Sequence, residues 1–135
     1  MPMSGETNLN ELFKSLVADL IPGVFVFATL ADRAVPAGLS PRMIFQEAEG
    51  TTLIILKSEA EEHGIAYEFP CRMITLNIHS SLEAVGFIAG IATELAKHDM
   101  GVNPVSGFFH DHLFVPDGRQ DDALVILEAM AKNAA

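Results

Sequence analysis

Short strand-like segments, most of them bounded by glycine or proline, alternate along this chain with amphipathic helical segments. The strand-like segments, which are β-branched, aromatic or alternating in polarity, are 24–28, 43–46, 52–56, 72–78, 102–106 and 113–115. The segments with apolar residues at helical spacing are 9–20, 58–63, 80–99 and 117–131. Short turns join several neighbouring strands, which favours antiparallel pairing with helices packed on one face. The pattern predicts an α+β sandwich of ferredoxin-like type with a largely antiparallel sheet.

Turn and capping residues indicate where several of these predicted strands and helices begin or end. Gly50 can supply the positive φ that a tight connection between the second and third strand-like segments needs, so these form the strongest hairpin signal. Asn8 can cap the first helix, and Ser80 with Glu83 forms a capping box for the longest one. Pro104 lacks a backbone donor, which predicts that its strand lies at a sheet edge.

The composition indicates one compact molecule that associates with copies of itself. The chain has 135 residues, the usual size of a single domain, and half of them are apolar. Charged residues make up only 19% and the mean hydropathy is +0.31, which indicates more apolar surface than a small monomer usually hides. We expect a homodimer or a higher homo-oligomer.

The charge balance excludes several classes of partner. The net charge is −10 and no two basic residues are adjacent, so neither nucleic acid nor an anionic membrane surface is an expected partner. The longest apolar runs, such as 84–92, are too short to span a bilayer. The first residues lack the features of a signal peptide, and Cys71 has no second cysteine to pair with, so we expect a cytoplasmic protein.

Five stretches of the sequence together resemble the ACT-domain family. They are 23–27, 44–53, 79–86, 95–103 and 107–116. More narrowly, the chain is similar to the small bacterial proteins in which two ACT-like halves are fused, related to the arginine-sensing CASTOR type. The resemblance covers nearly the whole chain and divides it into an N-terminal half, 1–70, and a C-terminal half, 71–135.

This resemblance implies a βαββαβ architecture, association of sheets side by side or face to face, and a regulatory pocket for an amino acid at a domain interface. It implies no catalysis and no cofactor. With no enzyme domain in the chain, we expect the regulation to act in trans. The positions that match the ligand-binding loops of the family are His79, Ser80, Ser81, Leu82, Asp99, Met100, Gly101, Val102 and Asn103.

The chemistry of these positions suits a zwitterion, although each also has a structural interpretation. Ser80 and Ser81 precede a helix start, where backbone donors attract a carboxylate, but one serine can simply cap the helix. Asp99 and Asn103 can receive an ammonium group while Gly101 allows close approach, but the same residues fit an ordinary helix exit with a left-handed glycine.

Two histidines provide the alternative of a metal site. His110 and His112 are two residues apart on a strand and can share a metal, with His79 as a third ligand. No cysteine pair or glutamate-bearing helix motif completes a zinc site, and the resembling family carries this stretch as part of its fold signature. A structural hydrogen-bonding role is therefore the favoured interpretation. The alternatives to a regulatory protein are an interaction module without a ligand and a metal-dependent enzyme that uses this cluster.

Two further features have mainly structural interpretations. Cys71 has no histidine at motif spacing, so we expect a buried thiol rather than a nucleophile. Gly86 and Gly90 lie one turn apart on the longest predicted helix and permit close approach of another element, either the sheet beneath or an oligomer partner.

Overall fold

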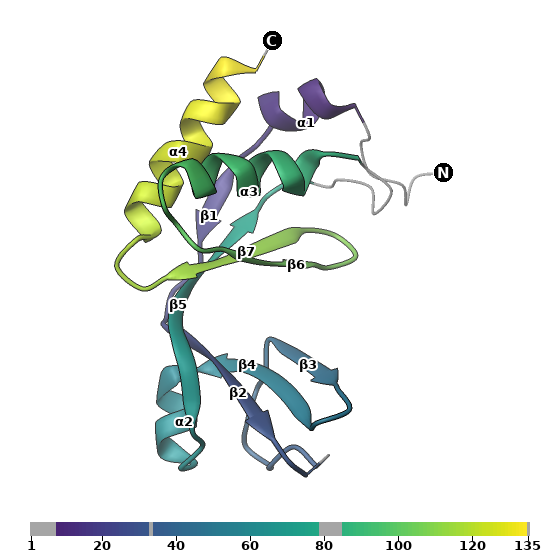
Figure 1. Cartoon of the computed structure of the whole chain (residues 1–135), viewed down its shortest axis with the longest axis vertical. Helices are drawn as coiled ribbons and strands as arrows, with labels where there is room; N and C mark the ends of the chain where they lie inside the picture. The colour runs from purple at the N-terminus through teal and green to yellow at the C-terminus, as the bar shows by residue number, and fades with distance from the viewer. Residues whose placement is uncertain (1–7, 33, 79–84, 135) are drawn as a thin grey trace. The chain divides into compact units, whose positions relative to one another are not determined.

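The structure, a computed structural model, describes residues 8–32, 34–78 and 85–134 (Figure 1). The elements in chain order are α1 (Leu9–Lys14), β1 (Ala18–Leu20), β2 (Phe25–Leu30), β3 (Met43–Gln46), β4 (Thr51–Leu56), α2 (Lys57–Glu62), β5 (Tyr67–Leu76), α3 (Phe87–Lys97), β6 (Asn103–Ser106), β7 (Asp111–Pro116) and α4 (Gln120–Asn133). The chain forms two compact units. One comprises Gly23–Cys71, and the other combines the segment up to Pro22 with the residues from Arg72 onward.

The unit 23–71 is built on a sheet with the strand order β3-β4-β2-β5, antiparallel at every pairing. The predicted hairpin is confirmed, with β3 paired to β4 from Met43↔Ile54 to Gln46↔Thr51. Gly50 is required in its turn, because a Cβ atom there would lie 2.5 Å from the Leu30 carbonyl oxygen. Numbered along the unit, the strands lie in the order second, third, first, fourth, which is the ferredoxin-like order.

One face of this sheet carries the core of the unit. The strands contribute four buried side chains, Val26, Ala28, Leu53 and Ile55, which pack with Ala60 of α2. In a full ferredoxin-like pattern a helix joins the first two strands. Here the described part of the connection between β2 and β3 contains no helix, and Val35 and Leu39 from it pack against the core instead.

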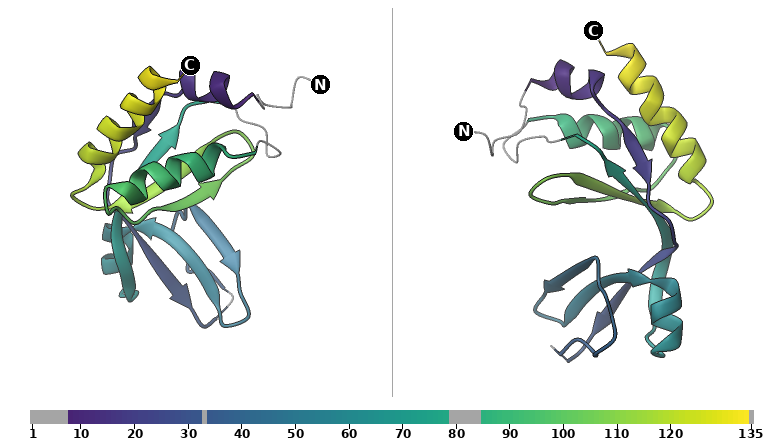
Figure 2. Two further views of the ribbon diagram at one scale, coloured as in Figure 1. Left: turned by 45° about the horizontal axis from the view of Figure 1, so that its top comes forward. Right: turned by 180° about the vertical axis from the view of Figure 1, so that it is seen from behind.

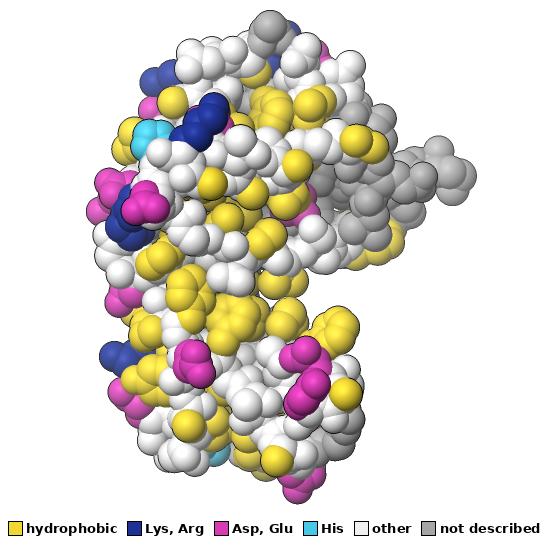
Figure 3. Space-filling view, viewed as in Figure 1, with side chains coloured by type: hydrophobic (Ala, Val, Ile, Leu, Met, Phe, Trp, Pro, Cys, Tyr) yellow, Lys and Arg dark blue, Asp and Glu magenta, His cyan; other side chains and the backbone are white. Residues whose placement is uncertain are grey.

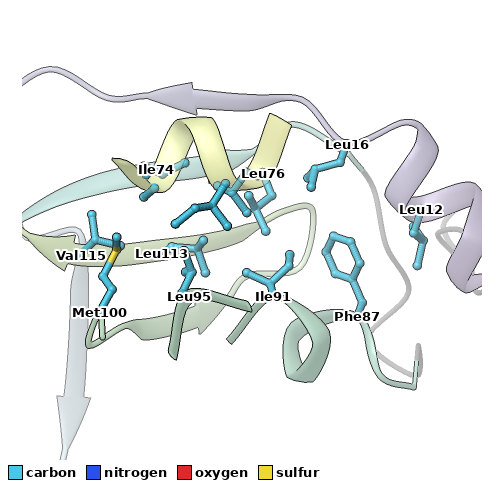
Figure 4. Packing of buried hydrophobic residues seen from close by; sticks show 13 residues of the cluster. Leu12, Leu16, Ile74, Leu76, Phe87, Ile91, Leu95, Met100, Leu113 and Val115 are labelled. Atoms are coloured by element: carbon cyan, nitrogen blue, oxygen red, sulfur yellow. The ribbon is translucent and has the colours of Figure 1, made fainter. Parts of the chain in front are cut away.

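The second unit has the strand order β1-β5-β7-β6, with α1, α3 and α4 on one face (Figure 2). Its core lies between that face and the helices, where Ile74, Leu76 and Leu113 from the strands meet Phe87 and Ile91 from α3 (Figure 4). The strand order is again ferredoxin-like if β1, which comes first in the chain, is counted as the fourth strand. The predicted α+β class and largely antiparallel sheet are therefore confirmed.

The predicted helix over 9–20 is wrong in its second half. Helix α1 begins after Asn8, whose side chain accepts a hydrogen bond from the Glu11 N–H at 3.1 Å as predicted, but it ends at Lys14. Residues 18–20 then form β1, in register with β5 from Ala18↔Leu76 to Leu20↔Ile74. Backbone pairing with a distant strand overrides the helical spacing of these apolar residues.

Strand β5 begins earlier than the predicted residue 72. It starts at Tyr67, although Phe69 has a φ of 57° and a proline follows. The register of β5 against β2 shifts between Phe25 and Phe27, which marks a β-bulge that absorbs these two residues. A bulge interrupts the alternation of side chains along a strand. The sequence of residues 67–70 therefore predicts connecting chain and not a strand.

Two predicted helix starts also differ from the observed ones. Helix α2 begins at Lys57 rather than at residue 58, and the Glu59 carboxylate accepts a hydrogen bond from the Leu56 N–H at 3.2 Å at the helix start. Helix α3 begins at Phe87 with Gly86 at the N-cap, whereas the prediction began at Ser80. Residues 79–84 lie outside the described part of the chain.

The division into halves 1–70 and 71–135 stays a prediction about the sequence. In three dimensions the described residues 8–22 pack with the C-terminal unit, because α1 and β1 contact α4 and β1 pairs with β5. Strand β5 therefore serves as the fourth strand of one unit and the first strand of the other.

Candidate functional site

The exit of helix α3 leads into the second of the two predicted ligand-binding loops. The helix ends at Lys97, the Asp99 N–H donates to the Ala96 carbonyl at 3.0 Å, and the Met100 N–H donates to the Leu95 carbonyl at 3.2 Å. These two bonds form a Schellman motif, which satisfies the last carbonyls of the helix. Its left-handed position is occupied by Asp99, with a φ of 58°, and not by a glycine.

Asp99 opposes two local preferences at once. A left-handed conformation is costly for a residue with a Cβ atom, although aspartate tolerates it better than most. A carboxylate at the C-terminal end of a helix also lies in the negative field of the helix dipole. The same field attracts cations, so an exposed Asp99 at this position suits an ammonium group.

The other residues of this loop are partly exposed to solvent and partly buried in the core. Asn103 is exposed at the start of the edge strand β6, and Gly101 is exposed in open space, where an added Cβ atom would meet nothing within 4 Å. Met100 is only 4% exposed and Val102 packs against the same core, so their side chains serve the fold. The expected left-handed glycine is wrong, because Gly101 is not among the glycines with positive φ.

The first predicted loop, with His79, Ser80, Ser81 and Leu82, lies outside the described residues. It falls between Ile78 and Val85 in the chain, and Val85 precedes the N-terminal end of α3. The 11 residues of α3 extend about 16 Å at 1.5 Å per residue, and Asp99 lies at the opposite end.

His110 and His112 are held by hydrogen bonds within their unit. The His112 Nδ1 atom is 3.0 Å from the Thr75 hydroxyl, and the His110 Nδ1–H donates to the Ile78 carbonyl at 3.3 Å. Both histidines are partly buried. The part of the chain that the structure describes contains no group of three side chains able to hold a metal. These contacts agree with the structural interpretation, while His79 lies outside the described residues.

The thiol and the two glycines also have structural roles. Cys71 is fully buried, and its thiol donates to the Phe25 carbonyl at 3.3 Å. Gly86 has a φ of 90° at the start of α3. At Gly90 a Cβ atom would lie 3.0 Å from the Phe13 ring, so the close neighbour is helix α1 of the same unit.

A groove of about 470 Å³ lies between α1, α3 and α4. Phe13, Met130 and Val125, which is 69% exposed, give it an apolar lining, and Glu94 and His98 add polar groups. The Lys97 ammonium donates a hydrogen bond to Glu94 at 2.8 Å and holds the pKa of that carboxyl below its usual value.

A second pocket, of about 460 Å³, lies on the helix-free face of the sheet in the unit 23–71. Sequence reasoning missed it, because its carboxylates, Glu47 and Glu68, are far apart in the chain and meet only through strand pairing. Strand β4, with two threonines followed by four apolar residues, has no alternation that could signal a partly polar face.

Comparison with family models identifies both halves of the sequence. An ACT-domain model matches residues 4–72, which is more than half of the chain, and a second ACT-domain model matches residues 68–129. The chain belongs to the ACT-domain family. As a tandem ACT protein it has the ferredoxin-like strand order in both of its compact units.

Solved structures support the same assignment. A Vibrio cholerae protein of unknown function, described as a possible transport protein, is 35% identical, with 91% of this chain and 95% of that chain covered and a TM-score of 0.81. An Agrobacterium tumefaciens protein is 17% identical, with 86% and 89% covered and a TM-score of 0.73. The ligand-free regulatory subunit of aspartate kinase from Thermus thermophilus is 11% identical, with 86% and 98% covered and a TM-score of 0.62. The last two likenesses show the fold alone.

Two further findings bear on function. Comparison with curated proteins gives no match. Among the described residues, no helix has both the length and the apolar character that a bilayer span requires.

Proposed function

We propose that this ACT protein is a regulatory protein that binds an amino acid and carries out no covalent chemistry. The observation that carries the proposal is the pair of ACT-domain matches over residues 4–72 and 68–129. ACT domains are usually regulatory and bind amino acids. A regulatory subunit of aspartate kinase shares this fold over 98% of its own length, and its name gives it a regulatory role.

The proposed site combines the two loops named from the sequence. Asp99 and Asn103 receive the ammonium group, because both are exposed and the C-terminal end of α3 favours a cation there. Gly101 lets the ligand approach the backbone closely. Ser80 and Ser81, with their backbone N–H groups, receive the ligand carboxylate, while His79 and Leu82 complete that loop.

We propose that each site lies between two copies of the chain, with loop 79–82 from one copy and loop 99–103 from the other. The ACT-domain matches support this arrangement, because the family is expected to bind its ligand at an interface between domains. Ligand binding then favours one arrangement of the two copies, and this shift changes the partner that the protein regulates. We place this homo-oligomer in the cytoplasm.

Calorimetric titration of the full chain with each of the twenty amino acids tests the proposal. At least one is expected to bind, and the double variant Ser80→Ala/Ser81→Ala is expected to lose affinity while keeping its melting temperature. Ser58→Ala, an exposed serine of the other unit, is the matched control. Unchanged affinity in the double variant would remove the serines from the site.

Mixing two defective variants tests the sharing between copies. A two-fold dimer of one Ser80→Ala/Ser81→Ala chain and one Asp99→Asn chain has one doubly altered site and one unaltered site. After subunit exchange at equal amounts, about a quarter of all sites are expected to bind with the affinity of the unaltered protein. A mixture with no high-affinity sites would show that each site lies within one chain.

A further inference from the structure

The lining of the pocket in the unit 23–71 includes aromatic side chains and two carboxylates. Phe27 pairs with Glu68 across β2 and β5, and Thr29 pairs with Thr52 across β2 and β4. Because side chains alternate along a strand, these four residues lie on the same face of the sheet, and all four line the pocket. Glu47, which also lines it, accepts a hydrogen bond from the Thr52 hydroxyl.

Neighbouring contacts position two of the side chains that line this pocket, Phe27 and Glu47. The Phe69 ring meets the Phe27 ring edge to face, with the ring centroids 5.8 Å apart. Phe69 has a φ of 57° at the bulge of β5, a conformation that bulky residues rarely adopt. The Thr52 hydroxyl donates a hydrogen bond to the Glu47 carboxylate and holds it beside β4, the second strand of the same hairpin.

The pocket lining is negatively charged, and the unit around it is negative in balance. Glu47 and Glu68 are the charged residues among the described lining residues, and no lysine or arginine is among them. The sequence of the unit is acidic in balance, with Asp32, Glu47, Glu49, Glu59, Glu61, Glu62 and Glu68 against Arg33, Arg42 and Lys57. Acidic side chains are also more prominent than basic ones over strands β2 to β4 in the space-filling view (Figure 3). The potential at the pocket therefore favours cations.

We propose that this pocket binds a small organic ammonium ion that carries an apolar body and no carboxylate. The ammonium group donates hydrogen bonds to the Glu47 and Glu68 carboxylates, and the apolar body lies over the Phe27 ring, which also attracts the cation. A zwitterionic amino acid is disfavoured, because its own carboxylate would face two glutamates and no basic side chain. The pocket lies within one unit and differs from the site proposed above in position and in ligand class.

The test is an NMR titration of the ¹⁵N-labelled full chain with 2-phenylethylamine. Saturable shifts are expected at residues 27–29 and 66–68. The anion 3-phenylpropionate, which has a similar shape, and L-phenylalanine, which adds a carboxylate to the same amine, are expected to leave these resonances unchanged. Binding of L-phenylalanine at the site proposed above would shift residues 99–103 instead, so the two proposals fail separately.

Charge-removing variants then test the role of the carboxylates. Glu68→Gln and Glu47→Gln are each expected to weaken amine binding about two- to fivefold, since both carboxylates are exposed. The double variant is expected to lose about tenfold. Glu49→Gln removes the same charge from an exposed position on the same hairpin outside the pocket and is expected to change the affinity less than about 1.5-fold. The proposal is overturned if the amine does not saturate these shifts, if 3-phenylpropionate binds equally well, or if both pocket variants bind like the control.

Discussion

Replacing Asp99 separates its cost to the fold from its proposed contribution to ligand binding. The left-handed φ of 58° costs a residue with a Cβ atom about 1–2 kcal/mol, and a carboxylate at a helix C-terminus adds about 0.5 kcal/mol. Asp99→Gly removes both costs but adds about 0.5–1 kcal/mol of chain entropy in the unfolded state. The net expectation is a gain of about 1 kcal/mol, which raises the melting temperature by roughly 3–5 °C for a domain of this size.

Asp99→Asn tests the contribution of the negative charge alone. Asparagine tolerates the left-handed region as aspartate does, so only the unfavourable interaction with the helix dipole is removed, for a gain of about 0.5 kcal/mol. Both variants are expected to bind the amino acid about tenfold more weakly, because a charge-assisted hydrogen bond is worth about 1.5 kcal/mol or more. Differential scanning calorimetry gives the stabilities and isothermal titration gives the affinities. Asp117→Asn, an exposed charge removal in the same unit, is the control.

Two results would refute this reasoning. If Asp99→Gly melts below the unaltered protein, the residue is not held in a costly conformation at the end of α3. If both variants are more stable and bind with unchanged affinity, Asp99 shapes the helix exit only and takes no part in binding.

Three more substitutions test the packing. Gly50→Ala places a Cβ atom 2.5 Å from the Leu30 carbonyl and should cost about 2–3 kcal/mol in urea unfolding; a neutral result would contradict the tight hairpin. Thr75→Val removes the hydroxyl bonded to His112 and should cost about 1–2 kcal/mol, with a shift of the His112 ring resonances in NMR; unchanged ring resonances would count against this contact. Ile91→Ala opens a cavity in a fully buried position and should cost about 2–5 kcal/mol by calorimetry, and a loss below about 1 kcal/mol would mean that α3 is not packed as described.

The predictable parts of the fold are those in which local signals agree. The hairpin of β3 and β4 combines alternation, β-branched residues and a glycine that the turn requires, so its strands are found from the sequence. Strand β1 is not, because its 3 residues become a strand only by pairing with Ile74–Leu76, more than fifty positions away. That one pairing also moves the N-terminal segment into the C-terminal unit.

The candidate site, too, could be predicted from the sequence only in part. The exit of α3 is found from the sequence because a polar turn follows an amphipathic stripe, but the positive φ lies at Asp99 and not at the expected Gly101. Glycine is the usual choice for that position, so no local rule selects an aspartate there. The pocket of Glu47 and Glu68 depends on the register of β2 against two neighbours, which the sequence does not specify by itself.

The central claim is that this ACT protein binds an amino acid, and thermal unfolding of the full chain with each of the twenty amino acids tests it most directly. At least one of them should raise the melting temperature, by an amount that grows with concentration and corresponds to about 2.7 kcal/mol at a hundredfold excess over the dissociation constant. If no amino acid changes the melting temperature at any concentration, the claim is contradicted.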